Sequence, residues 1–563
     1  MSVKNFLARI VVLTSLALAA GFTAHAQAQA NADACANSRD LRLTNGKIAT
    51  MDAKNSMVTE VTIQEGRFAY VGASGGHKLN PCTKVIDLRG RTVVPGLIDN
   101  HNHYVLFGSR PGHEIQLETA STIAQAMDML KSRAATTPPD AWVTTIGDWV
   151  PRQFVENRYP TVAELDQAVP KNPVLLMPGG GAPVTNTLGK KYLESKGVTV
   201  NDAGIIPAGP QAAKALNELR ALWTLKDEMG GYEYAQEFML SYGLTTSVDQ
   251  GYFALPSSTD VMDDATADGI ASLDLWHGYD GITAMDRENK LTERVRLFII
   301  NQDKDKDVPI LKQRLLNTFP EFGDDMLRIS GIGEFASNWF GFNWKAGQHP
   351  DNFQDALELV AKYGWNFQQH AISLEEVKFT AQTFLKVNEV TPIASLHWSI
   401  GHVAQIDPET IDEMKGIGAG LALHGYRYLS GQGNSTLPLG PPYRTALKSG
   451  IHVGAGSDAG DFFVLDPWPN IYYIVTGKDV RGQLVNDGEQ VNREQALRMY
   501  SADNPWFIHE EDKLGSIETG KLADLAVLSA DYFDPKKVPD EEIKNLKSVL
   551  TVVGGKIVYN KLQ

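Results

Sequence analysis

Short apolar runs alternate with amphipathic stretches through the central part of the chain. The runs are brief, which is typical of strands, and several of the stretches between them have helical spacing, such as residues 352–363 and 374–388. One predicted strand runs into His101. The others are predicted at residues 244–249, 295–300, 327–333, 365–370, 392–402, 418–424 and 451–458.

This alternation predicts an α/β fold. Repeated strand–helix units favour a parallel sheet, and eight strands favour closure into a (β/α)8 TIM-like barrel. The barrel is expected over residues 96–514. That span is longer than the ~250 residues of a plain barrel, so an insertion is expected after the first strand, at about residues 104–242.

The two ends of the chain have a different pattern. Residues 41–51, 58–71 and 83–98 are short β-type runs separated by turn dipeptides such as Asn45-Gly46. Residues 522–528 and 549–559 repeat this pattern near the other end. We therefore expect one composite β-sandwich, built from residues 38–95 and 515–563.

The first 28 residues have the pattern of a signal peptide. Lys4 and Arg9 precede an apolar stretch at 10–21, and small residues at 24–28 form cleavage sites. No later apolar run is long enough for a membrane span, so we expect an exported protein, periplasmic or secreted. In an oxidising compartment, Cys35 and Cys82 are expected to form a disulfide.

Charge excludes one class of partner. The 563 residues carry a formal net charge of −15 without a basic cluster, so nucleic acid is not an expected ligand. A small-molecule substrate is expected instead. A homo-oligomer is compatible with the sequence, which does not fix the oligomeric state.

His101 and His103 end the first predicted barrel strand. Side chains two positions apart on a strand point the same way, so both imidazoles leave one face. Two imidazoles on a rigid strand are half of a site for zinc or a similar divalent ion. The alternative is that one histidine caps the strand while the other lies on a loop.

Further polar residues lie where other predicted strands end, the end at which barrel active sites form. Several imidazoles would leave a divalent ion, expected to be Zn²⁺ with one or two ions bound, with open positions at which water loses a proton. A carboxylate beside that water can accept the proton and pass it on. The candidates after His101 and His103 are Glu334, His370, His402, His424 and Asp458.

These motifs together resemble the amidohydrolase superfamily, and within it the YtcJ-like branch, amidohydrolase family 3. The resemblance covers nearly the whole chain after the leader and implies a metal-dependent hydrolase with a barrel and a composite β-sandwich. It implies metal or catalytic roles for His101, His103, His370, His402 and Asp458. The motifs are PGLIDNHNH (95–103), NFQQHAI (366–372), IGHVAQ (400–405), GSDA (456–459) and LGSIETGKLADLAVL (514–528).

The chain departs from this branch in two places. Arg328 is expected where the branch has a strand-four lysine that can bridge two metals, and an arginine cannot bridge. Glu334 is the nearest carboxylate that could replace it. Gly181 falls where the branch often has a histidine in the insertion. His424 and Trp339 are candidate substrate contacts. A core or capping role is equally open for His424, and packing is the commoner role of an aromatic cluster such as the one that contains Trp339.

The expected reaction is hydrolysis of a C–N, amide-like bond by metal-activated water. Asp458 would shuttle the proton, and the metal with His402 or His424 would stabilise the oxyanion. Three alternatives remain: a non-catalytic binding protein on the same scaffold, a hydrolase of esters or other non-amide bonds, and an isomerase. The sequence does not name the substrate or the metal.

Overall fold

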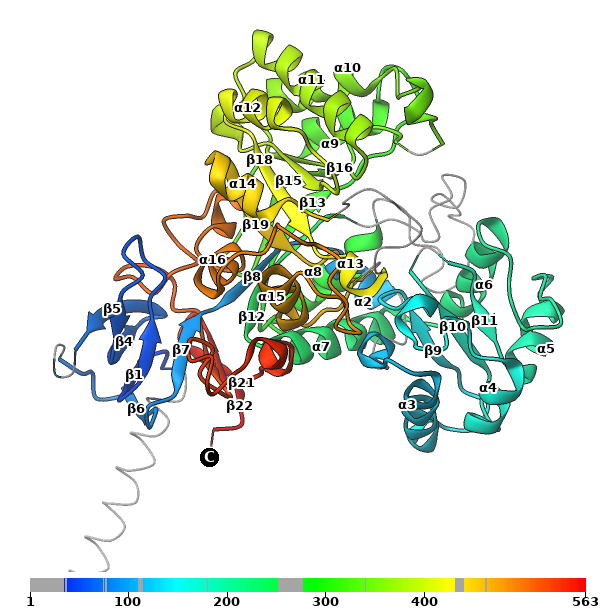
Figure 1. The fold of residues 1–563 in the computed structure, drawn as a ribbon, viewed down its shortest axis with the longest axis horizontal. Coiled ribbons are helices and arrows are strands. Elements are labelled where there is room, and N and C mark those ends of the chain that lie inside the picture. Colours follow the sequence, from blue (N-terminus) through cyan, green and yellow to red (C-terminus); the bar gives the residue numbers. More distant parts are fainter. Residues whose placement is uncertain are drawn as a thin grey trace, which may run out of the picture.

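The computed structural model shows a barrel with a β-rich part on one side and a mixed lobe of helices and short strands on the other (Figure 1). It describes residue 35 and residues 38–562, except 74, 76–77, 110–114, 180, 252–276, 340, 431–439 and 461–462. The predicted signal peptide, residues 1–28, lies outside the described residues.

The barrel consists of eight strands, and each is hydrogen-bonded to its neighbour in parallel. The predicted (β/α)8 barrel is confirmed. In spatial order the strands are β8 (Leu97–Asn102), β12 (Leu244–Asp249), β13 (Arg294–Ile299), β15 (Leu327–Glu334), β16 (Phe367–Ala371), β17 (Ser399–His402), β18 (Gly420–His424) and β19 (His452–Gly456). A short strand, β14 (Phe322–Gly323), pairs antiparallel with β15.

The first and last strands meet at their carboxyl ends. The backbone N–H of Asp458, just after β19, donates to the carbonyl oxygen of His101 in β8 at 2.8 Å. The N–H of His103 donates to the carbonyl oxygen of Ala459, also at 2.8 Å. His101 and Asp458, both expected to be functional, are therefore joined by a backbone hydrogen bond across the seam of the barrel.

One predicted strand was too long. Residues 392–398 were expected to extend β17, but the chain there forms a turn with the 3₁₀ segment η6 (Ala394–Leu396). The side chain of Asn388 in the preceding helix accepts the N–H of Ile393 at 3.0 Å, so this N–H does not pair with a strand. Only Ser399–His402 pairs with a neighbouring strand.

Helices cover the outside of the barrel. In α10 the buried positions Phe353, Ala356, Leu357, Val360 and Ala361 follow helical spacing and face the sheet. A capping box between Ser373 and Glu376 starts the following helix. The outer helices are α7 (Leu225–Ser241), α8 (Asp280–Arg287), α9 (Pro309–Asn317), α10 (Phe353–Lys362), α11 (Leu374–Val390), α12 (Pro408–Gly416), α14 (Tyr443–Ser449), α15 (Pro467–Thr476) and α16 (Arg493–Met499).

The β-rich part beside the barrel consists of two sheets, built from strands of both ends of the chain. One sheet has the order β5-β4-β1-β6, and the other has the order β22-β21-β20-β7-β2-β3. Lys47 and Asp531, 484 residues apart in the chain, form an ion pair between its two halves. The strands are β1 (Leu41–Thr44), β2 (Lys47–Ala49), β3 (Met57–Val58), β4 (Glu60–Gln64), β5 (Arg67–Gly72), β6 (Lys84–Asp87), β7 (Thr92–Pro95), β20 (Leu525–Leu528), β21 (Ser548–Val553) and β22 (Lys556–Asn560).

Between β8 and β12 the chain forms a lobe on the other side of the barrel (Figure 1). Its apolar side chains pack largely into cores of their own, around Trp149, Leu165 and Leu175. Its elements are β9 (Val143–Ile146), β10 (Val174–Met177), β11 (Val184–Thr185), α3 (Ile123–Thr136), α4 (Val162–Ala168), α5 (Thr187–Ser195) and α6 (Pro210–Arg220).

A disulfide joins Cys35 to Cys82, which confirms the predicted pair. It fastens the chain ahead of β1 to the loop ahead of β6. Among the described residues, no helix combines the length and the apolar character that crossing a membrane requires.

Candidate metal centre

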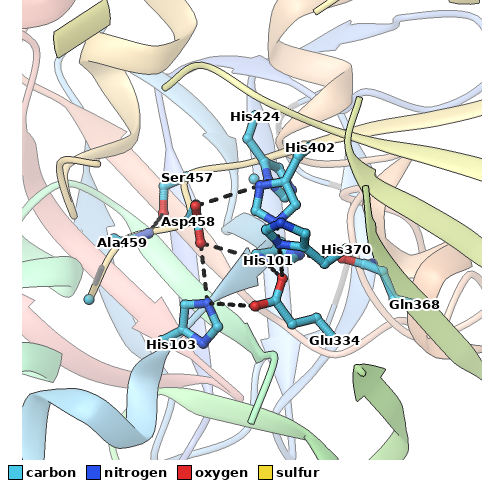
Figure 2. Close-up of polar contacts among 12 residues, drawn as sticks. His101, His103, Glu334, Gln368, His370, His402, His424, Ser457, Asp458 and Ala459 are labelled. Atoms are coloured by element: carbon cyan, nitrogen blue, oxygen red, sulfur yellow. Dashed lines mark hydrogen bonds and ion pairs between the residues drawn. The ribbon is translucent and has the colours of Figure 1, made fainter. Parts of the chain in front are cut away.

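His101 and His103 form one side of the site, at the carboxyl end of β8 (Figure 2). Both are buried, and their Nε2 atoms lie 3.6 and 3.2 Å from Oδ1 of Asp458. Nδ1 of His101 contacts the side-chain oxygen of Gln368. Nδ1 of His103 faces the carbonyl oxygen of Gly251 at 3.3 Å. Because an oxygen acceptor places the proton on Nδ1, Nε2 of each ring keeps its lone pair for a metal ion.

Glu334 ends β15 and stands between two pairs of histidines (Figure 2). Its Oε2 lies 2.9 Å from His370 Nδ1 and 2.9 Å from His402 Nε2. The same oxygen lies 3.6 Å from His101 Nε2, and Oε1 lies 3.8 Å from His103 Nε2. One carboxylate therefore faces all four imidazoles.

This donor set fits divalent metal ions. His101, His103 and Glu334 form one group of candidate ligand atoms within 4.8 Å of one another, and Glu334, His370 and His402 form a second. The buried Nε2 of His101 has no hydrogen-bond partner among the described residues, as expected of an atom reserved for a metal. Nitrogen and carboxylate oxygen are ligands that zinc accepts, and Glu334 would hold an ion together with either pair of histidines.

The charges in the site favour an ionised Glu334. Burial alone would raise the pKa of this carboxyl, but His370 and His402 hold it well below its usual range. Burial acts to lower the pKa of His370, and Glu334 outweighs it, so that pKa is raised. Burial and then the neighbouring His370 lower the pKa of His402 to about 4. A neutral His402 has a free lone pair for a metal.

Asp458 faces this cluster from the loop after β19. Burial opposes its ionisation, but His402, His101 and His103 hold its pKa far below the usual value. Its backbone has a positive φ of 63°, a conformation rare outside glycine that functional residues adopt where the surroundings enforce it. The carboxylate is therefore an ionised proton acceptor held beside the candidate ligands.

His424 completes the cluster from the end of β18. It is fully buried, and its Nδ1 lies 2.9 Å from Nδ1 of His402. Its ring centroid lies 4.0 Å from that of His101. Burial, followed by the nearby His101 and His402, lowers the pKa of His424 well below its usual range, so the neutral ring is favoured.

A family model described as the amidohydrolase family matches residues 84–559. The chain belongs to this family. The resemblance inferred from the motifs is confirmed, and this member of the amidohydrolase family carries candidate metal ligands at the carboxyl end of its barrel.

Named relatives match along almost their whole length. The N-substituted formamide deformylase of Arthrobacter pascens is 24% identical, over 93% of this chain and 99% of that protein. YtcJ of Bacillus subtilis (strain 168) is 23% identical, over 92% of this chain and 98% of YtcJ. This amidohydrolase therefore matches both relatives along nearly their whole length.

Solved structures agree on the fold. An uncharacterized metal-dependent hydrolase from Pyrococcus furiosus superposes with a TM-score of 0.59 at 19% identity, covering 88% of this chain and 100% of the other. A zinc complex of atrazine chlorohydrolase TrzN from Arthrobacter aurescens TC1 superposes with a TM-score of 0.51 at 17% identity, covering 92% and 95%. At these identities the likeness shows the fold alone.

The prediction for Arg328 was wrong in position. Arg328 lies at the start of β15, whereas Glu334 lies at its end, so the two side chains belong to opposite ends of the barrel. Arg328 pairs with the buried Glu510 at 2.9 Å, and Arg296 pairs with the same carboxylate at 2.7 Å. No charge from Arg328 therefore opposes a second cation at the amidohydrolase site.

Trp339 and Gly181 lie outside the cluster of candidate ligands. Trp339 is 1% exposed, and its ring packs on Trp344 and Phe353 at centroid distances of 4.6 and 5.0 Å. Its contact with substrate stays a prediction. Gly181 lies in the lobe, where a Cβ atom would come within 2.7 Å of Pro178. A histidine side chain at this position would require the ring of Pro178 to shift.

Sequence reasoning missed Gln368, whose side-chain oxygen holds Nδ1 of His101. Such outer partners orient a metal ligand and fix its tautomer. A signal existed, because Gln368 precedes His370 by two positions on the same strand and so points to the same face.

Proposed function

We propose that this amidohydrolase hydrolyses a C–N bond of a small amide-like substrate. The observation that carries the proposal is the placement of Glu334 between two histidine pairs, with the ionised Asp458 beside them. This arrangement provides ligands for an ion and a proton acceptor at the same place. The expected ion is Zn²⁺, as one ion or two, because the donors are nitrogen and carboxylate oxygen.

A divalent ion in this site acts as a Lewis acid toward a carbonyl oxygen and lowers the pKa of water. Asp458 would accept one proton from the attacking water as its oxygen bonds to the carbonyl carbon. The protonated Asp458 would then return that proton to the nitrogen as the C–N bond breaks. The products are a carboxylic acid and an amine, and Asp458 is left as the carboxylate.

The amide-like substrate of this proposal is supported by the relative from Arthrobacter pascens, which carries the name N-substituted formamide deformylase. The barrel seam supports the proton transfer, because backbone bonds from His101 and His103 hold the Asp458 loop against the ligands. An imidazole N–H of His424 would stabilise the oxyanion of the addition intermediate.

We also propose that the protein acts after export, in a periplasmic or secreted location. The pattern of residues 1–28 and the Cys35–Cys82 disulfide support this, because disulfides persist in oxidising compartments. Fractionation of expressing cells with N-terminal sequencing of the recovered protein tests it. Recovery in the cytoplasm with an intact leader would contradict export.

The substrate class is tested with purified protein of known metal content. Protein prepared without chelator is analysed for metals and then assayed with N-substituted formamides, N-acyl amino acids, cyclic amides and esters. We expect bound Zn²⁺ and release of an amine from at least one amide class. The Asp458→Asn variant is the control, because its ligands stay in place while the proton acceptor is lost.

Each alternative predicts a different outcome of this panel. Hydrolysis of esters without any C–N cleavage would show that the protein is an esterase and would contradict the proposed reaction. Tight binding of amides without turnover, by protein carrying its full metal content, would indicate a binding protein on the same scaffold.

A further inference from the structure

His424 lies outside the two groups of ligand atoms that share Glu334, yet it touches one of their members. Its Nδ1 lies 2.9 Å from Nδ1 of His402, which is a hydrogen-bond distance. Both rings are buried, with exposures of 0% and 3%, so water does not compete for this contact. One nitrogen of the pair must donate a proton and the other must accept it.

The direction of this bond follows from the other side of the His402 ring. Nε2 of His402 lies 2.9 Å from Oε2 of Glu334, on the side where the candidate ligands converge. A metal ion bound there requires an unprotonated Nε2 on His402. A neutral imidazole then carries its proton on Nδ1, so His402 donates and His424 accepts.

No other described group takes this place. Asp458 has its Oδ2 3.6 Å from Nδ1 of His402, beyond hydrogen-bond range. Its other oxygen, Oδ1, faces Nε2 of His103 at 3.2 Å. His424 is therefore the acceptor nearest to the proton of His402.

We propose that His424 is a positioning residue, which accepts the Nδ1 proton of His402 and so holds Nε2 of His402 toward the metal. It would do for His402 what Gln368 does for His101 on the neighbouring side of the site. The proposal rests on the metal site of the proposed function but not on the substrate or the bond cleaved.

Three variants of His424 distinguish its role as a hydrogen-bond acceptor from the effect of its buried ring. His424→Phe keeps a buried ring without an acceptor, His424→Leu removes the ring, and His424→Gln restores an acceptor oxygen. Metal affinity is measured by competition with a chelator, and metal content by elemental analysis. We expect Phe and Leu to weaken the affinity by roughly 10–100-fold, the usual effect of removing an outer partner of a ligand, and Gln to keep it near the original.

A variant on the adjacent strand provides the matched control. His452 begins β19, at the opposite end of the barrel from the site, and His452→Phe should leave the metal affinity unchanged. Thermal unfolding of each metal-free variant checks folding. Should one apolar variant fail to fold, the other still tests the proposal.

Several results would overturn the assignment. If Phe and Leu bind metal as tightly as the original protein, His424 has no positioning role. If His424→Gln lowers the metal affinity as much as His424→Phe does, the hydrogen-bond acceptor at this position does not determine the affinity. Loss of one bound ion in all three variants makes His424 a ligand, in the group that it forms with His101 and His402. Absence of metal from the unaltered protein would instead refute the proposed function.

Discussion

Glu334→Gln is the most direct test of the site, because the substitution removes one charge and keeps the size of the side chain. The amide oxygen of glutamine can still contact His370 or His402, which lie 2.9 Å away in the structure. Any large change in metal binding therefore reports the lost negative charge and not a cavity.

The expected size follows from the distances. Every nitrogen facing Glu334 lies 2.9–3.8 Å from its oxygens, and an ion between them would be no farther away. At about 4 Å and an effective dielectric constant of about 20, two unit charges attract by about 4 kcal/mol. A divalent ion is attracted more strongly, so we expect a loss of at least about 1000-fold in affinity, or the loss of one bound ion.

The assay combines elemental analysis with chelator competition on the Gln variant and the unaltered protein. Glu293→Gln is a matched control, since this carboxyl is also fully buried, and burial raises its pKa well above the usual range. That change should leave metal binding intact. Unchanged stoichiometry and affinity in Glu334→Gln would refute the bridging carboxylate and leave a site for one ion without it.

Three further expectations concern other parts of the molecule. Asp458→Asn should lower turnover by roughly 10²–10⁴-fold with unchanged metal content, measured by amine release, and a turnover within a few-fold of the original would remove Asp458 from the reaction. Cys82→Ser should cost about 2–4 kcal/mol of stability in denaturant titration, because the Cys35–Cys82 bond closes a loop with a sequence separation of 47; an unchanged midpoint would contradict it. Burial and the stacked His397 lower the pKa of His509 to about 4, below the ordinary 6.5, so the unfolded chain takes up a proton first. The Tm should therefore fall as the pH drops from about 6.5 toward 4, and His509→Phe should flatten that fall.

The barrel strands could be predicted from their brief strand-like runs between helical stretches. β12 was predicted at 244–249 and observed at Leu244–Asp249, where a short run rich in β-branched residues follows the turn at Gly243. The apolar residues of 392–398 misled the prediction, because they form a turn in which the N–H of Ile393 donates to the side chain of Asn388 and not to a neighbouring strand. Hydrophobicity alone does not report such a contact.

The site was predictable in its members more than in its geometry. The ends of parallel strands meet at one end of a barrel, so His101, His370 and Glu334 were expected together and are together. Arg328 was misplaced because spacing along one strand did not show which end of the barrel it faces. The contact between His402 and His424 depends on the stagger of β17 against β18, which no pattern in the sequence encodes.

The sheet that contains β7 has a consequence for how the protein is made. β7 lies between β2, which precedes it in the chain, and β20, which is synthesised only after the whole barrel. Until β20 arrives, β7 presents an open edge that other chains could pair with. A product truncated ahead of β20 would keep every candidate ligand and the whole barrel, yet it would be prone to aggregate. This sheet can therefore close only once β20 has been synthesised.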